Sequence, residues 1–100
     1  MTSEEYLEEA KVPLTTDSVP RLWRLARLEY DPVRQRHVLL YPEGAVLLND
    51  TGAAILELCN GTRTVDQIVT ILTERYHADV RADVTEYLDH MAEKELVRAG

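Results

Sequence analysis

The most constraining feature of the sequence is a Tyr-Pro-Glu-Gly turn at residues 41–44, which lies between two short apolar runs. Proline presets the φ angle of the second turn position, and glycine accepts the left-handed conformation of a bulged type I turn. The run before the turn, residues 37–41, is apolar on both faces, as in a central strand. The sequence therefore predicts an antiparallel hairpin in which Gly44 is left-handed and residues 45–48 return as an edge strand.

Residues 21–30 alternate between apolar and polar side chains, which is typical of a strand with one buried face. The apolar side of this alternation carries Leu22, Ala26, Leu28 and Tyr30. Asp31 and Pro32 then begin a turn. Together with the hairpin, this segment predicts a three-stranded antiparallel meander.

The residues after Asn49 have helical periodicity. Asn49 or Asp50 can cap a first helix with an apolar body at residues 53–59, and Gly61 supplies its end. Thr64 and Gln67 form a capping box for a second helix. A third helix is predicted over residues 79–95, capped by Asp79, and a short extended tail follows at residues 96–97. The apolar stripe of the third helix is Val80, Val84, Tyr87, Leu88 and Met91.

Three strands followed by three helices make an α+β domain that is winged helix-turn-helix-like, and we place it at residues 21–98. Residues 1–20 have no sustained period and carry a net charge of −4, so we expect a flexible, acidic N-terminal arm. Residues 21–41 carry +3, although the whole chain carries −7. This uneven distribution favours cationic partners for the acidic surfaces.

The sequence has no feature of a catalytic or metal site. The three histidines, at positions 37, 77 and 90, do not lie four residues from one another or from Cys59, the single cysteine. No apolar run approaches the roughly 20 residues of a membrane span, and the N-terminus does not resemble a secretory signal. We therefore expect a cytoplasmic protein that is not an enzyme and has no metal, no cofactor and no membrane partner.

Two binding functions remain. A winged-helix transcriptional regulator would insert a helix into DNA, but residues 79–95 carry a net charge of −4, which a polyanion repels. The edge strand of residues 45–48 contains no charge and no proline to block pairing, so a partner peptide could add as a further strand. The residues alone give equal support to an alternative, in which the third helix, or a second copy of the protein in a homodimer, covers this edge strand.

Several segments of the chain together match the pattern of a known family. They are Leu39-Leu40-Tyr41-Pro42-Glu43-Gly44, Leu48-Asn49, Ile55-Leu56-Glu57-Leu58-Cys59-Asn60-Gly61, Asp83-Val84 and Tyr87-Leu88. With these segments the chain resembles the PqqD family, which acts in pyrroloquinoline quinone biosynthesis. The resemblance runs from about residue 19 to residue 97 and departs from the family at Asn60, where Asp is usual.

The resemblance implies a recognition domain of three strands and three helices that binds the precursor peptide PqqA. It also implies that the domain presents this peptide to the radical SAM enzyme PqqE, which joins a Glu and a Tyr of the peptide. The iron–sulfur clusters and S-adenosylmethionine belong to that enzyme. The leader of the precursor typically carries lysine, which suits an acidic helix beside the strand edge.

We expect the peptide site to lie between the edge strand and the third helix. The backbone of the edge strand would pair with the peptide, and the third helix would line a groove beside it, although Tyr87 and Met91 also belong to its apolar stripe. The predicted site residues are Ala45, Val46, Leu47, Leu48, Asp83, Tyr87, His90, Met91 and Lys94.

Overall fold

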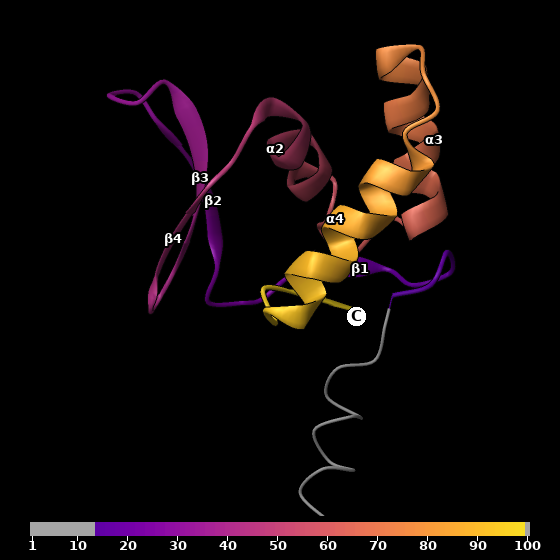
Figure 1. The fold of residues 1–100 in the computed structure, drawn as a ribbon. Helices are drawn as coiled ribbons and strands as arrows, with labels where there is room; N and C mark the ends of the chain where they lie inside the picture. The colour runs from indigo at the N-terminus through magenta and orange to yellow at the C-terminus, as the bar shows by residue number, and fades with distance from the viewer. Residues whose placement is uncertain (1–13, 100) are drawn as a thin grey trace, which may run out of the picture.

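The computed structural model describes residues 14–99 (Figure 1). Most of the predicted arm, residues 1–13, lies outside the described residues. The elements in chain order are β1 (Pro20–Leu22), β2 (Arg27–Asp31), β3 (Arg36–Tyr41), β4 (Gly44–Leu47), α2 (Asp50–Glu57), α3 (Val65–Tyr76), α4 (Arg81–Glu93) and β5 (Val97–Ala99).

The predicted antiparallel meander is confirmed. Its strand order is β2-β3-β4, with β3 in the centre, and Leu39 pairs with Leu28 on one side and with Val46 on the other. Figure 1 shows that α2, α3 and α4 all lie on one side of this sheet. Over residues 14–99 the fold is therefore α+β, with the three-stranded sheet and the three helices that the sequence indicated.

The single strand predicted for residues 21–30 is wrong. The segment contains two strands, β1 and β2, separated by a turn in which Ala26 N donates to the carbonyl of Trp23 over 2.8 Å. β1 pairs not with the meander but with β5, where Leu22 lies opposite Val97. Periodicity did not indicate the break, because the partner of β1 is at the far end of the chain.

The prediction of a left-handed Gly44 is also wrong. Gly44 pairs directly with Tyr41, so Pro42 and Glu43 form a two-residue loop. Among the described glycines, the positive φ angle, +82°, belongs to Gly61. This residue lies beyond the end of α2 at Glu57, so it does not end the helix, and its N–H donates to the carbonyl of Pro20 over 3.1 Å.

The helix starts agree with the predicted caps at two of three places. Asn49 caps α2, and Thr64 and Gln67 form the predicted capping box of α3. The start of α4 differs, because the N-cap position is Val80, whose side chain makes no capping bond. Asp79 instead accepts the backbone N–H of Arg81 over 3.0 Å.

The core lies between the meander and the helices. Its fully buried members include Leu39 of the sheet, Ile55 of α2, Leu72 of α3 and Leu88 of α4. Leu28 and Val46 pack against this core from the same face of the sheet as Leu39.

Residues 14–20, which the sequence analysis assigned to the arm, contact the rest of the domain. The carbonyls of Thr16 and Ser18 accept the N–H groups of Asp66 and Val65 at the start of α3. The side chain of Leu14 packs on the core. These residues are therefore part of the packed structure.

Candidate functional site

The outer edge of β4 is a row of backbone groups that no described strand covers. Leu48 N donates to the carbonyl of His37 over 3.0 Å, so the His37 backbone points toward β4. The N–H and C=O groups of successive residues in a strand point alternately to its two edges, so those of Val46, two residues before Leu48, also point to β3. The N–H groups of Ala45 and Leu47 must then point outward, away from the sheet, where a partner strand could accept them.

The side chains of β4 divide in the same alternating way. Ala45 and Leu47 are exposed, Val46 is half-buried against the core and Leu48 is 3% exposed. Leu48 is therefore a core residue, and of the predicted strand residues only Ala45 and Leu47 offer both an outward N–H and an accessible side chain.

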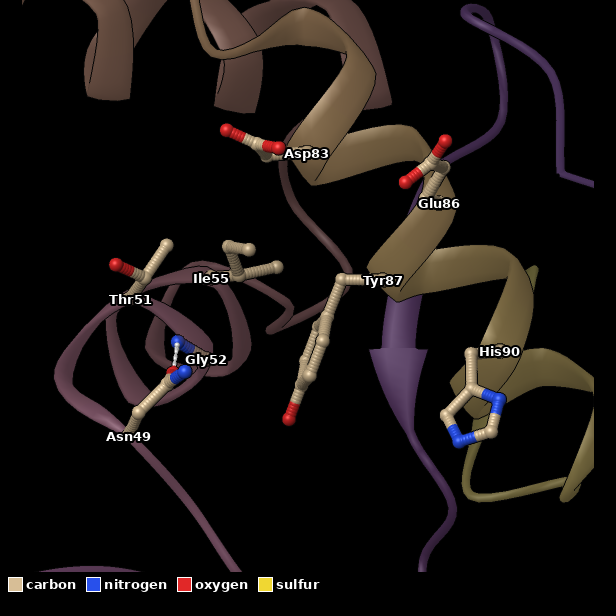
Figure 2. Close-up of a pocket in the computed structure, with 8 residues that line it drawn as sticks. All are labelled: Asn49, Thr51, Gly52, Ile55, Asp83, Glu86, Tyr87 and His90. Carbon is tan, nitrogen blue, oxygen red and sulfur yellow. Dashed lines mark hydrogen bonds between the residues drawn. The ribbon is translucent and has the colours of Figure 1, made fainter.

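A cavity of about 430 Å³ opens between the first turn of α2 and the face of α4 (Figure 2). The residue that links β4 to α2, Asn49, is part of its wall, so the edge strand leads directly into it. The residues that line the cavity are Asn49, Thr51, Gly52, Ile55, Asp83, Glu86, Tyr87 and His90.

Some of the site residues predicted on the third helix line this cavity, and others do not. Asp83, Tyr87 and His90 follow one another along one face of α4 and all line it. Met91 is 2% exposed and belongs to the core. Lys94 lines a different cavity, of about 420 Å³, together with Trp23 and Tyr41.

Two parts of the cavity are absent from the predicted site residues: the wall contributed by α2 and one acidic residue of α4. Glu86 lies three residues after Asp83 and four before His90, and this spacing could have placed it on the same face. Thr51, Gly52 and Ile55 could not have been found in this way, because their position depends on how α2 packs against α4.

The cavity is negatively charged. Asp83 and Glu86 are both exposed carboxylates, and no Lys or Arg lines the same wall. Acidic side chains that face one cavity favour a cationic partner, and water weakens the attraction at such exposed positions. The site therefore suits a lysine or arginine side chain better than a phosphate.

Tyr87 occupies the junction between the two helices. Its hydroxyl oxygen is buried and has no hydrogen-bond partner among the described residues, and burial raises the pKa of this phenol. The approach depends on Gly52, because a Cβ atom there would lie 2.9 Å from the hydroxyl oxygen. The carboxamide oxygen of Asn49 is already engaged, since it accepts Gly52 N over 2.7 Å.

Cys59 does not line this cavity. It is buried, its Sγ donates to the carbonyl of Ile55 over 3.3 Å, and burial raises its pKa to about 12. Over residues 14–99, no three or more His, Cys, Asp or Glu side chains are grouped to hold a metal ion. No helix in this range is both long and apolar enough to cross a bilayer.

Comparison with known proteins identifies the family. The family model for "Coenzyme PQQ synthesis protein D (PqqD)" matches residues 36–97, which include the hairpin, all three helices and the start of β5. The chain belongs to the PqqD family. This confirms the resemblance drawn from the turn and the helix end.

Individual PqqD relatives agree with this assignment. The "PqqA binding protein" of Methylococcus capsulatus is 43% identical over 77 residues, covering 76% of this chain and 83% of that protein. The "Bifunctional coenzyme PQQ synthesis protein C/D" of Methylorubrum extorquens is 44% identical over 82 residues, covering 79% of this chain but 22% of that protein. A PqqD-type domain therefore also occurs within a longer PQQ synthesis protein.

A solved PqqD structure has the same fold. The solution structure of the PqqD truncation of Methylobacterium extorquens PqqCD superposes with a TM-score of 0.76 at 40% identity. The match covers 88% of this chain and 97% of that one, which is described as a functional, stand-alone RiPP recognition element.

Proposed function

We propose that this protein binds the precursor peptide PqqA by strand addition and presents it to the radical SAM enzyme PqqE, without acting as an enzyme itself. The observation that carries the proposal is the pair of outward N–H groups at Ala45 and Leu47, on an uncharged edge that leads into the acidic cavity. The names of the PqqD relatives, which include PqqA binding proteins, support the choice of peptide.

In the proposed complex, a segment of PqqA lies antiparallel to β4 and extends the meander by one strand. Backbone pairing holds the segment whatever its sequence, and side chains that reach the neighbouring cavity provide selectivity. Asp83 and Glu86 select a cationic side chain, and His90 and Tyr87 border it. The peptide then remains accessible from its outer edge, as presentation to PqqE requires.

An amide-shift titration with synthetic PqqA tests the binding step. We expect shifts at residues 45–48 and 83–90 and none along α3, which lies away from the site. Asp83→Lys should weaken binding by about tenfold, because it reverses a charge at the cavity. Asp89→Lys is the matched control, since this exposed residue of the same helix does not line the cavity. Shifts confined to α3, or equal affinity losses in both variants, would contradict the proposed site.

Two further measurements test the other steps. Incubation of PqqA with this protein alone should leave the peptide mass unchanged. Addition of PqqE should yield a complex that contains both the protein and the peptide. If no such complex forms, the proposed presentation to PqqE is wrong, but the proposed binding of PqqA is not affected.

A further inference from the structure

A cavity lined mainly by arginine lies beside the short sheet of β1 and β5. Its volume is about 310 Å³, and its lining residues are Arg21, Leu22, Trp23, Arg24 and Arg98. The three arginines are exposed, and none of the described residues that line this cavity is acidic. Arginine stays protonated at physiological pH, so three positive charges meet here. We call this cavity the arginine pocket.

The strand register places two of these charges directly against each other. Arg21 of β1 lies opposite Arg98 of β5. Like charges at directly opposed positions of paired strands destabilise a sheet. The ion pairs among residues 14–99 involve none of the three arginines of the pocket. An anion bound between these side chains would relieve the repulsion.

Arg98 is oriented by two contacts that do not use the ends of its side chain. Its guanidinium carbon lies 5.5 Å from the centre of the Trp23 ring, and its Nε donates to the carbonyl of Glu95 over 3.3 Å. Neither contact uses the terminal Nη groups. Paired N–H groups of arginine bind a carboxylate through two parallel hydrogen bonds, so Arg98 is suited to this class of ligand.

A second cavity connects the arginine pocket to the edge of β4. This connecting cavity, of about 420 Å³, shares Trp23 and Arg98 with the arginine pocket and extends to Glu43 in the β3–β4 turn. Figure 1 shows that this turn and the end of α4 lie at the same end of the meander. Two acidic and two basic side chains line the connecting cavity, namely Glu43, Glu95, Lys94 and Arg98. The net positive charge therefore belongs to the arginine pocket.

Strand addition fixes the order in which a peptide passes these cavities. An antiparallel peptide strand begins at the Leu47 end of β4, where Asn49 lines the acidic cavity, and ends beside Gly44 at the turn. The four residues of β4 span about 13 Å. Peptide residues that follow the paired segment are therefore directed toward the connecting cavity and then the arginine pocket.

A single carboxylate suits the arginine pocket better than a polyanion does. The pocket is small, and Leu22 and the ring of Trp23 lie beside its arginines. A phosphate backbone would extend beyond it, over Glu43 and Glu95 of the connecting cavity. These acidic groups repel further negative charge, so nucleic acid would gain little from the three arginines.

We propose that the arginine pocket binds a carboxylate side chain of PqqA, downstream of the segment that pairs with β4. The inference rests on the proposed function. It predicts the order of charges in the ligand, because the cationic side chain beside Asp83 and Glu86 comes first and the carboxylate follows. The reverse order would place each charge beside groups of its own sign, so the two cavities also fix the direction of the bound peptide.

The variants Arg24→Gln and Arg98→Gln test the pocket in a double-mutant cycle with the peptide. Each variant should weaken PqqA binding by about three- to fivefold, as expected for an exposed ion pair. In PqqA, each carboxylate is changed in turn to the corresponding amide. One such peptide should lose the same factor with the wild type and lose nothing further with either variant. Arg75→Gln, at an exposed position of α3, is the matched control and should bind all peptides as the wild type does.

The unchanged protein gives a second measurement, because Trp23 is the single tryptophan of the chain. In an isotope-labelled sample, its indole N–H signal reports on the arginine pocket. Unlabelled PqqA should shift this signal, and the amide peptide that lost affinity should leave it near its free position at saturation. This measurement does not depend on the folding of any variant.

The carboxylates at the start of this chain are the other candidate ligand. Replacement of Glu4, Glu5, Glu8 and Glu9 by Gln should leave the indole signal of the free protein unchanged. A changed signal would show that the chain's own carboxylates occupy the pocket, and the inference would be wrong.

The outcomes separate this inference from the proposed function. Wild-type PqqA affinity in both arginine variants, or the same loss for every peptide whatever its carboxylates, would overturn the inference. Strand addition would still stand if PqqA slows amide exchange at Ala45 and Leu47. If inorganic phosphate shifts the indole signal and PqqA does not, the pocket takes a free anion and the inference is also overturned. If the wild type does not bind PqqA, the proposed function fails as well.

Discussion

At the scale of single residues, Tyr87 and Gly52 explain how the cavity keeps its shape. The phenol ring fits over the first turn of α2 only because position 52 has no side chain. The cost of this fit is a buried hydroxyl without a partner among the described residues. A buried polar atom without a hydrogen bond destabilises a fold. The ring of Tyr87 therefore stabilises the packing of α2 on α4, whereas its hydroxyl group destabilises the folded state.

Removal of the hydroxyl should therefore stabilise the protein. We predict that Tyr87→Phe raises the free energy of unfolding by about 1 kcal/mol, because the ring remains and the unsatisfied group is gone. Urea denaturation measures the change. Tyr76→Phe, at an exposed position of α3, is the control and should have little effect. A less stable Tyr87→Phe variant would indicate that the hydroxyl has a partner in solution.

Cys59 gives a prediction about alkaline pH. Burial raises the pKa of its thiol from 9.0 to about 12, so the folded state retains the proton after the unfolded state has lost it. Stability is therefore complete below pH 9 and falls as the pH rises from 9 toward 12. Between pH 8 and pH 10 the wild type should lose about 1 kcal/mol more than Cys59→Ala.

Chemical denaturation of both proteins at the two pH values measures this difference. Cys59→Ala retains the tyrosines and lysines of the wild type, so their titration cancels in the comparison except at Tyr87, whose pKa is raised by burial and in part by Cys59. Parallel losses in the two proteins would show that the thiol is not protected by the core.

At the scale of elements, the sequence predicted local features well and long-range pairing poorly. The hairpin and the capping box each depend on residues within a few positions of one another, and the structure has both. β1 pairs with β5, at the opposite end of the described chain, and the alternating pattern therefore predicted a single strand in place of β1 and β2. The candidate site was likewise only partly predictable. The residue spacing along α4 indicated its share of the lining, but nothing local indicated the share of α2.

The direction of the β4 backbone allows a sharp proline test. Proline lacks an N–H and is tolerated in a sheet only where that group points outward. We predict that Ala45→Pro and Leu47→Pro fold but lose PqqA affinity. Val46→Pro and Leu48→Pro should lose most of their stability, because each removes a bond to β3. Thermal unfolding and peptide titration of the four variants provide the measurements.

The opposite edge of the meander supplies the control. By the same alternation, the N–H of Tyr30 on β2 points away from β3. Tyr30→Pro should therefore fold and bind PqqA normally. If Ala45→Pro and Leu47→Pro fold and still bind with wild-type affinity, the peptide is held by side chains rather than by strand addition.

At the scale of the whole molecule, the uncharged edge of β4 and the acidic cavity lie side by side. In the proposed complex, the edge pairs with the peptide backbone and the cavity takes a cationic side chain. The acidic character of residues 79–95 could be predicted from the sequence. The cavity itself could not, because it depends on how α2 packs against α4.

The central claim is that PqqA becomes a strand of this sheet, and amide hydrogen exchange tests it most directly. In the free protein the N–H groups of Ala45 and Leu47 face solvent, and in the complex each should donate to the peptide. We predict that saturating PqqA slows their exchange by at least about tenfold, while the outward amides of Leu28 and Tyr30 exchange as before. Exchange of Ala45 and Leu47 at free-state rates in the saturated complex would contradict strand addition.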